Sequence, residues 1–317
     1  MKPGLRHICS AMLLLTALPL AAERAILTHQ AVDKVSVVDV DTAKTLATVP
    51  VAAAPVGVAY DPLRHRIYST HPEKGLITII DSNTYEKIGE IKTGGQPFGI
   101  VVDDSGKRQV FVTDWERDAL LVINAESMLV VDLLAVGSKP AGIALDSKAR
   151  RLYIANRESD SVTVLDADTP DQYAEVKTGK APYAVAVSHD GQQVYVAGIQ
   201  DNTVTVIETK EYTVKATLDV GDKPYGVATS PDNKHLLVAN QGSNDVWLFD
   251  QQSLEEKARI KVGEMPESVS VSADSQQAYV TNWFSNDVSV IDLQQRKETR
   301  RWPVAEAPRS LGHFIAD

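Results

Sequence analysis

The sequence predicts an all-β chain of seven repeated units, each a four-stranded sheet, and three observations support this. Short runs of alternating apolar and polar residues lie between Gly, Pro, Asn and Asp clusters, which is the pattern of β-strands. No segment has the pattern of a long amphipathic helix. A proline recurs every 42 or 43 residues, at Pro55, Pro97, Pro140, Pro182, Pro224, Pro266 and Pro308. Repeats of this length with four strands are typical of propeller blades, so we predict a seven-bladed β-propeller.

The unit that begins at Pro224 illustrates the four strands. Residues 226–229 alternate as the innermost strand A, and a Ser-Pro-Asp-Asn turn leads to strand B at 236–239. A Gly-Ser-Asn-Asp turn precedes strand C at 246–249, and strand D is expected at 257–262. In five units strand C ends at an aspartate, which suits an Asx turn into strand D. These aspartates are Asp39, Asp81, Asp166, Asp250 and Asp292.

The unit that begins at Pro308 is split between the two ends of the chain. After Pro308 only residues 309–317 remain, enough for one inner strand. At the other end, residues 25–29 repeat the pattern of 67–71, and 35–39 repeat that of 77–81. We therefore expect the N-terminal strands to pair with the C-terminal one and close the ring. Closure removes strand edges that an open ring would leave free.

The first 22 residues have the order of a secretory signal peptide. Lys2 and Arg6 precede an apolar run from Ile8 to Leu20, and two alanines follow it. The run is shorter than the ~20 residues that span a bilayer, so we expect cleavage rather than a membrane span. Cys9 lies at the start of the run and not at its end, where a lipid-anchored cysteine would have to be. Residues 23–317 should then form a single propeller domain in the periplasm.

Composition narrows the partners and cofactors. Removing Lys2 and Arg6 with the signal leaves 30 basic against 42 acidic residues, a net charge of −12. This balance disfavours nucleic acid, which needs a basic face. The only cysteine is lost with the signal and no CxxCH motif is present, which excludes thiol nucleophiles and c-type haem. No catalytic motif of the common hydrolase or phosphate-binding types is found.

One motif carries a family resemblance. Residues 279–282 read Tyr-Val-Thr-Asn and 286–292 read Asn-Asp-Val-Ser-Val-Ile-Asp, with degenerate copies at 111–114, 153–156, 195–198 and 237–240. The chain resembles the YVTN-family β-propellers over its whole mature length, and most closely their small periplasmic members. That resemblance implies a binding or scaffold protein of unspecified ligand. Propellers on similar rings include lactonases and haem d1-binding proteins.

Candidate site residues lie where the repeat varies on one face, formed by the D–A and B–C connections. The residue after each repeated proline should lie near the axis. These residues are Val56, Phe98, Ala141, Tyr183, Tyr225, Glu267 and Arg309. Three aromatic rings beside an acid and a base are typical of a binding funnel. The same aromatics could instead plug the channel.

The last position of strand B lies on the same face and also varies. Its Asn consensus is replaced by His29, His71 and Asp114 in three adjacent units. Imidazole and carboxylate are ligands for zinc or copper, so these residues are a candidate metal site. Equivalent positions one blade apart should be on the order of 10 Å apart, so the histidines would have to lean together. Polar side chains that cap turns are the alternative.

Other aromatic and histidine residues are weaker candidates. Trp115 and Trp283 follow strand B on the same face and could mark a contact surface. His189 should lie in a solvated turn on the opposite face, and His313 should pack in the inner strand of the closing blade. The leading hypothesis is a non-enzymatic binding or scaffold propeller for a small ligand, a metal ion or an envelope protein. The alternatives are a metallochaperone and a lactonase-like or haem d1-type propeller.

Overall fold

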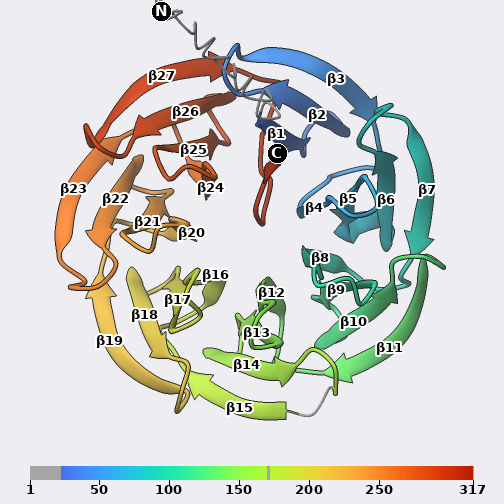
Figure 1. The fold of residues 1–317 in the computed structure, drawn as a ribbon, viewed down its shortest axis with the longest axis horizontal. Helices are drawn as coiled ribbons and strands as arrows, with labels where there is room; N and C mark the ends of the chain where they lie inside the picture. Colours follow the sequence, from blue (N-terminus) through green and yellow to red (C-terminus); the bar gives the residue numbers. More distant parts are fainter. Residues whose placement is uncertain (1–22, 170–171, 317) are drawn as a thin grey trace, which may run out of the picture.

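The computed structural model describes residues 23–169 and 172–316, and these form one ring of seven four-stranded antiparallel sheets (Figure 1). The predicted all-β, seven-bladed β-propeller is confirmed. The predicted signal peptide, residues 1–22, lies outside the described residues. One short 3₁₀ helix, η1 (Pro72–Lys74), interrupts the strands of the described part. No helix among the described residues is long and apolar enough to cross a membrane.

The strands of the first four blades follow the 42-residue period. The closing blade contains β1 (Arg24–His29), β2 (Lys34–Asp39), β3 (Lys44–Pro50) and β28 (Ile315–Ala316). The next contains β4 (Val58–Asp61), β5 (Arg66–His71), β6 (Leu76–Asp81) and β7 (Lys87–Lys92). Then come β8 (Pro97–Val102), β9 (Gln109–Asp114), β10 (Ala119–Asn124) and β11 (Leu129–Ala135). The fourth contains β12 (Pro140–Asp146), β13 (Arg151–Asn156), β14 (Ser161–Asp166) and β15 (Gln172–Lys177).

The remaining three blades are built in the same way. The fifth contains β16 (Pro182–Val187), β17 (Gln193–Gly198), β18 (Thr203–Glu208) and β19 (Thr213–Asp219). The sixth contains β20 (Pro224–Thr229), β21 (His235–Asn240), β22 (Asp245–Asp250) and β23 (Glu256–Lys261). The seventh contains β24 (Pro266–Val271), β25 (Gln277–Asn282), β26 (Asp287–Asp292) and β27 (Lys297–Pro303). In every blade strand A lies nearest the axis and strand D at the rim.

The repeated motif has a structural explanation. Its aromatic residue is almost completely buried between blades, as in Tyr68, Phe111, Tyr153, Tyr195 and Tyr279. Its threonine hydroxyl donates a hydrogen bond to a main-chain carbonyl 28 residues later, in the inner segment of the next blade. This bond measures 2.7–3.2 Å from Thr28, Thr70, Thr113 and Thr281. The motif therefore holds neighbouring blades together.

The aspartates that end strand C make the predicted Asx turns. In Asp81, Oδ1 accepts the backbone N–H groups two and three residues later, at 2.8 and 2.9 Å. Asp166 and Asp250 do the same at 2.7–3.1 Å. These carboxylates satisfy turn amides that the strands leave unpaired. Their recurrence thus reflects the fold and not a repeated ligand site.

The ring is closed by strands from both ends of the described chain. β28 lies between the axis and β1, with Arg24 opposite Ala316 and Ala25 opposite Ile315. The backbone N–H of Ile26 donates to the carbonyl of Phe314 at 2.8 Å. Phe314, Ile315 and Ala316 are at most 5% exposed. The predicted split blade is confirmed.

The segment before β28 departs from the other inner strands. Ser310 and Gly312 have φ values of 54° and 115°, so the chain turns toward the axis instead of pairing continuously (Figure 1). Two main-chain bonds join Leu311 to the next blade. Its N–H donates to the carbonyl of Val56 at 3.1 Å, and its carbonyl accepts from the N–H of Val58 at 3.0 Å. The closing segment is therefore anchored to two blades at once.

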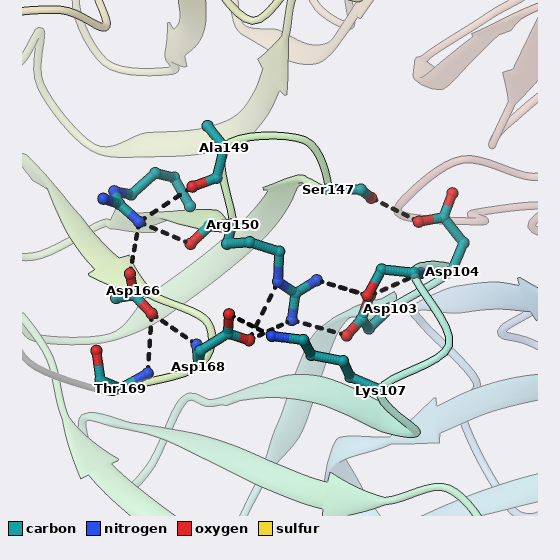
Figure 2. A network of polar contacts seen from close by, with 11 residues as sticks. Asp103, Asp104, Lys107, Ser147, Ala149, Arg150, Asp166, Asp168 and Thr169 are labelled. Carbon is teal, nitrogen blue, oxygen red and sulfur yellow. Dashed lines mark hydrogen bonds and ion pairs between the residues drawn. The ribbon is translucent and has the colours of Figure 1, made fainter.

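On the face of the A–B turns, neighbouring turns are hydrogen-bonded around the ring. These bonds of 2.6–3.1 Å join Ser147 to Asp104, Asp190 to Asn233 and Asp232 to Ser275. Between the blades of β8 and β12 ion pairs add to the Ser147–Asp104 bond (Figure 2). Arg150 binds Asp103 through both terminal nitrogens at 2.8 Å and Asp168 at 2.8 Å, and Lys107 lies 2.5 Å from Asp168. Asp103 is fully buried.

Candidate functional site

The structure brings together the variable residues that follow the repeated prolines. The ring of Phe98 lies 5.0 Å from that of Trp115 and 6.0 Å from that of Tyr183, measured between centroids. Tyr183 lies 4.8 Å from Tyr225. Phe98, Tyr183 and Tyr225 come from β8, β16 and β20, so the contact of Phe98 with Tyr183 joins two blades that are not neighbours. We call Phe98, Tyr183, Tyr225, Glu267 and Arg309 the axial cluster.

Arg309 is the centre of the axial cluster. Its guanidinium donates to the Tyr183 hydroxyl at 2.8 Å and to Oε1 of Gln30 at 3.1 Å. Its Nε lies 3.3 Å from Oε2 of Glu267, whose other oxygen accepts from Gln241 at 2.9 Å. The side chains of Arg309 and Glu267 are only 17% and 8% exposed. Pairing and hydrogen bonding of this kind offset the free-energy cost of burying the two charges.

Burial dominates the electrostatics of this cluster. It raises the pKa of Tyr183 to about 12, and it raises the pKa of Glu267 against the opposing effects of Arg309 and Gln241. Burial alone would lower the pKa of Arg309, but Tyr183 and Glu267 raise it. Tyr183 therefore stays a neutral phenol at physiological pH. Of the two interpretations that the sequence left open, this packing fits a plug that closes the axis.

Beneath the axial cluster lies a cavity of about 260 Å³ on the axis. Tyr225, which belongs to the axial cluster, and Leu311 form part of the cavity wall. The rest of the wall is formed by inner strands from their third residue onward, and small or apolar residues dominate it. These include Gly99, Gly142, Ala144, Ala184, Ala186, Val227, Ala228 and Val269. Small side chains on the inner strands thus leave the axis hollow.

The cavity continues into a wider vestibule of about 570 Å³. The two share wall residues Leu145, Val187, Thr229, Val271 and His313. The vestibule is also lined by residues in or next to the A–B turns, among them Asp104, Asp146, Ser147, Lys148 and His189. The hollow therefore lies toward the A–B turn face, opposite the face that the sequence analysis favoured. Sequence reasoning missed the hollow because the small residues that leave the axis open form no recognisable motif.

His313 corrects one sequence prediction. We expected it to pack in the inner strand of the closing blade, but it is exposed and borders both the cavity and the vestibule. The reason is that β28 begins only at Ile315, so His313 belongs to the segment that turns toward the axis. His189 also borders the vestibule. Two imidazoles from different blades therefore face one mouth.

The three candidate metal ligands are each engaged within their own region. The Nδ1 of His29 lies 3.0 Å from the carbonyl of Ala305, and its Nε2 lies 3.0 Å from Oγ of Ser36. Asn156 makes the equivalent bond to Thr163 at 2.8 Å. Since a carbonyl only accepts, Nδ1 of His29 carries the proton.

His71 shares only the first of these contacts, and Asp114 is held by other groups. The Nδ1 of His71 bonds to the carbonyl of Ala53 at 3.2 Å, while its buried Nε2 has no hydrogen-bond partner among the described residues. Asp114 accepts from Nε of Arg117 at 2.8 Å and from the backbone of Gln96 at 3.1 Å. All three candidates are fully buried. No group of three His, Cys, Asp or Glu in the described residues is placed to hold a metal ion, and these contacts fit the capping alternative.

The buried His29 predicts a pH-dependent stability. Burial lowers its pKa from 6.5 to about 4, so the folded protein keeps the ring neutral while the unfolded chain takes up a proton. The neutral ring contributes its full stability above about pH 6.5. As the pH falls toward 4, this contribution to the free energy of unfolding decreases by about 3 kcal/mol. We expect His29→Asn to remove most of this loss, because Asn already occupies the position in other blades. Urea unfolding of the wild type and the variant at pH 7.5 and pH 4.5 measures this loss of stability.

The control for this prediction is His65→Asn, in an exposed A–B turn. That variant should keep the wild-type dependence on pH. An unchanged pH dependence in His29→Asn would show that other groups cause the acid loss.

The tryptophans take different places. Trp115 packs on Phe98 and extends the axial cluster. Trp283, directly after β25, is half-buried and is followed by Phe284, which is 61% exposed. A contact with an envelope protein at these residues stays a prediction.

The fold and site together define a propeller whose axis is closed at one face and hollow toward the other. A family model, the cytochrome D1 heme domain, matches residues 151–301, just under half of the chain. That stretch runs from β13 to within β27. A search of the curated proteins finds no match.

Several solved structures share the fold. Hydrazine synthase from Kuenenia stuttgartiensis is 22% identical, with a TM-score of 0.76 over 89% of this chain and 99% of that chain. A functionally unknown protein from Desulfotomaculum acetoxidans is 15% identical, with a TM-score of 0.77 over 92% and 98%. The dihydro-heme d1 dehydrogenase NirN in complex with DHE is 16% identical, with a TM-score of 0.69 over 96% and 76%. Identities this low show the fold alone.

Proposed function

We propose that the protein is a periplasmic binding propeller that holds a small ligand on its axis and admits it from the A–B turn face. The observation that carries this proposal is the cavity, closed behind by the axial cluster and continuous with a vestibule in front. Clefts with an apolar wall and a few placed polar groups are the usual form of small-molecule sites. This replaces the face suggested by sequence with the opposite one.

The wall chemistry defines the ligand class. The deep part is lined by Gly, Ala, Val and Ile, which favours an apolar group. At the mouth, Asp104, Asp146, Lys148 and His189 supply charged and hydrogen-bonding groups of both signs. The vestibule lies in the size range of about 300–1,000 Å³ that suits organic ligands, and the deep cavity is slightly smaller. We therefore expect a ligand with an apolar end inside and a polar end at the turns.

Filling the cavity tests this proposal. Ala186→Phe adds a ring to the wall and should abolish co-purification of the ligand from the native periplasm, as measured by native mass spectrometry. Ala186→Ser keeps the volume nearly unchanged and should retain it. Melting temperature and circular dichroism verify that both variants are folded. Retention of the same bound mass by folded Ala186→Phe would contradict an axial site.

A specific ligand class, the tetrapyrroles, is favoured by two observations. The family model that matches residues 151–301 is the cytochrome D1 heme domain, and one similar structure is a dihydro-heme d1 dehydrogenase in complex with DHE. Histidine is a usual axial ligand of haem iron, and His313 and His189 both border the vestibule. These two residues would hold such a group, and it would supply redox chemistry. The donor set therefore fits an iron tetrapyrrole.

Absorbance separates this class from a colourless ligand. Protein purified from its own periplasm, or titrated with haem, should show a visible band that His313→Ala shifts or weakens. His65→Ala, in an exposed turn, should leave the band unchanged. If the protein is colourless and binds no haem, but Ala186→Phe still abolishes binding of another ligand, the axial site stands and the tetrapyrrole proposal is wrong.

A further inference from the structure

One of the seven rim strands differs from the others in its chemistry. β11 reads Leu-Val-Val-Asp-Leu-Leu-Ala and has no lysine or arginine. Every other rim strand carries at least one: Lys44 in β3, Lys87 in β7, Lys177 in β15, Lys215 in β19, Lys257 in β23 and Lys297 in β27. Charged residues, lysine above all, protect exposed strand edges from pairing with other chains. β11 lacks lysine and has a single charged residue, Asp132.

The apolar side chains of β11 are open to solvent. Leu129 is 62% exposed, Val131 59%, Leu133 48% and Val130 36%. β11 ends its sheet, whose order is β11-β10-β9-β8, so its outer edge has no neighbouring strand (Figure 1). Exposed apolar residues that gather on one strand mark an interaction site more strongly than scattered ones do. The outer edge and the side chains thus point to the same surface.

We propose that β11 binds an extended, apolar segment of another protein as a fifth strand, with a basic residue of that segment facing Asp132. Adding a strand to a free edge satisfies backbone groups and lets alternate side chains pack on the sheet. Asp132 is the one charged residue of β11 and is exposed. An opposite charge directly across a strand pair is favourable, whereas a like charge is unfavourable.

The charge of Asp132 also argues against a second copy of the chain as the occupant. In an antiparallel pair of two β11 strands that uses all seven residues, Asp132 lies at the centre and faces the Asp132 of the other copy. Each copy also carries a net charge of −10 over the full sequence, so the two repel. In the free protein the Asp132 carboxylate accepts the backbone N–H of Leu133 at 2.8 Å. This contact covers one amide of the edge until a partner replaces it.

The probe is a pair of fluorescent eleven-residue peptides of alternating valine and threonine, one with arginine at its centre and one with glutamate. We expect the arginine peptide to bind about fivefold more tightly, the size of one favourable cross-strand charge pair. Fluorescence anisotropy gives the affinities. Bound peptide should slow amide hydrogen exchange in β11 and leave exchange in the other rim strands unchanged.

Two substitutions make the test specific. Val131→Lys should abolish binding, while Val214→Lys, at a valine 47% exposed on β19, should leave it unchanged. Asp132→Lys should reverse the preference toward the glutamate peptide. Absence of binding, equal loss in both lysine variants or an unreversed preference would overturn the proposal. A wild-type dimer that Val131→Lys dissociates would also overturn it and identify a second copy as the occupant.

Discussion

Deleting residues 309–317 is expected to make the propeller aggregate. The deletion removes β28 and with it the buried side chains of Phe314, Ile315 and Ala316, which pack on Ala25, Ile26 and Leu27. It also removes the main-chain bonds of Leu311 to the neighbouring blade. β1 would then present a free edge beside an opened apolar core, and such edges pair with other chains. Size-exclusion chromatography and thermal unfolding measure the loss of monomer.

A circular permutant is the matched control for this deletion. Arg24 and Ala316 are paired neighbours, so a short linker can join the two ends. New ends between Lys210 and Glu211 fall in an exposed turn between β18 and β19, where breaks are tolerated. The permutant should fold and melt cooperatively because it keeps every strand. A truncated protein that remained monomeric with an unchanged melting temperature would show that closure does not depend on this pairing.

The fold was predictable because its determinants recur. Seven prolines in register, the Tyr-Val-Thr-Asn motif and the aspartates after strand C each occupy the same structural position in most blades. The structure gives each a physical reason: Tyr279 fills the space between blades, Thr281 bonds to the next blade, and Asp292 caps a turn. A periodic sequence can therefore be interpreted by comparison with itself. The inner strand of the closing blade was less predictable, since Ser310 and Gly312 break the pattern there.

The site was predictable only in part. The residues after the prolines do converge on the axis, and their mixture of Tyr183, Glu267 and Arg309 signalled an unusual cluster. Whether they line a funnel or close one depends on side-chain directions, which sequence does not contain. The cavity itself is made by small residues such as Gly142 and Ala186, which have no distinctive chemistry. The two histidines at the end of strand B are the opposite case. Their side chains are chemically distinctive, but their contacts fit a structural role within the blade.

Arg150→Ala is expected to destabilise the protein by about 3–5 kcal/mol. Arg150 is 14% exposed and binds the fully buried carboxylate of Asp103 through two parallel hydrogen bonds, so the substitution leaves a buried charge unpaired (Figure 2). Burial raises the pKa of Asp103, but Arg150 and Ser105 overcome this and lower it in the folded protein. Chemical denaturation at pH 7 measures the loss. Lys107→Ala is the control, because Lys107 is 52% exposed and its ion pair should contribute at most about 1 kcal/mol.

The pH dependence of Arg150→Ala shows whether the unpaired charge is the cause. In the wild type, Asp103 contributes stability above its unfolded pKa of about 3.9, and that contribution is lost as the pH falls through its lower folded pKa. Without Arg150, burial should raise the pKa of Asp103. The penalty should therefore be full at pH 7 and shrink as the pH falls and Asp103 takes up a proton. The double variant with Asp103→Asn should recover part of the lost stability at pH 7, since it removes the charge that Arg150 neutralises. A penalty that stays the same at every pH, with no recovery in the double variant, would assign the loss to packing of the Arg150 side chain.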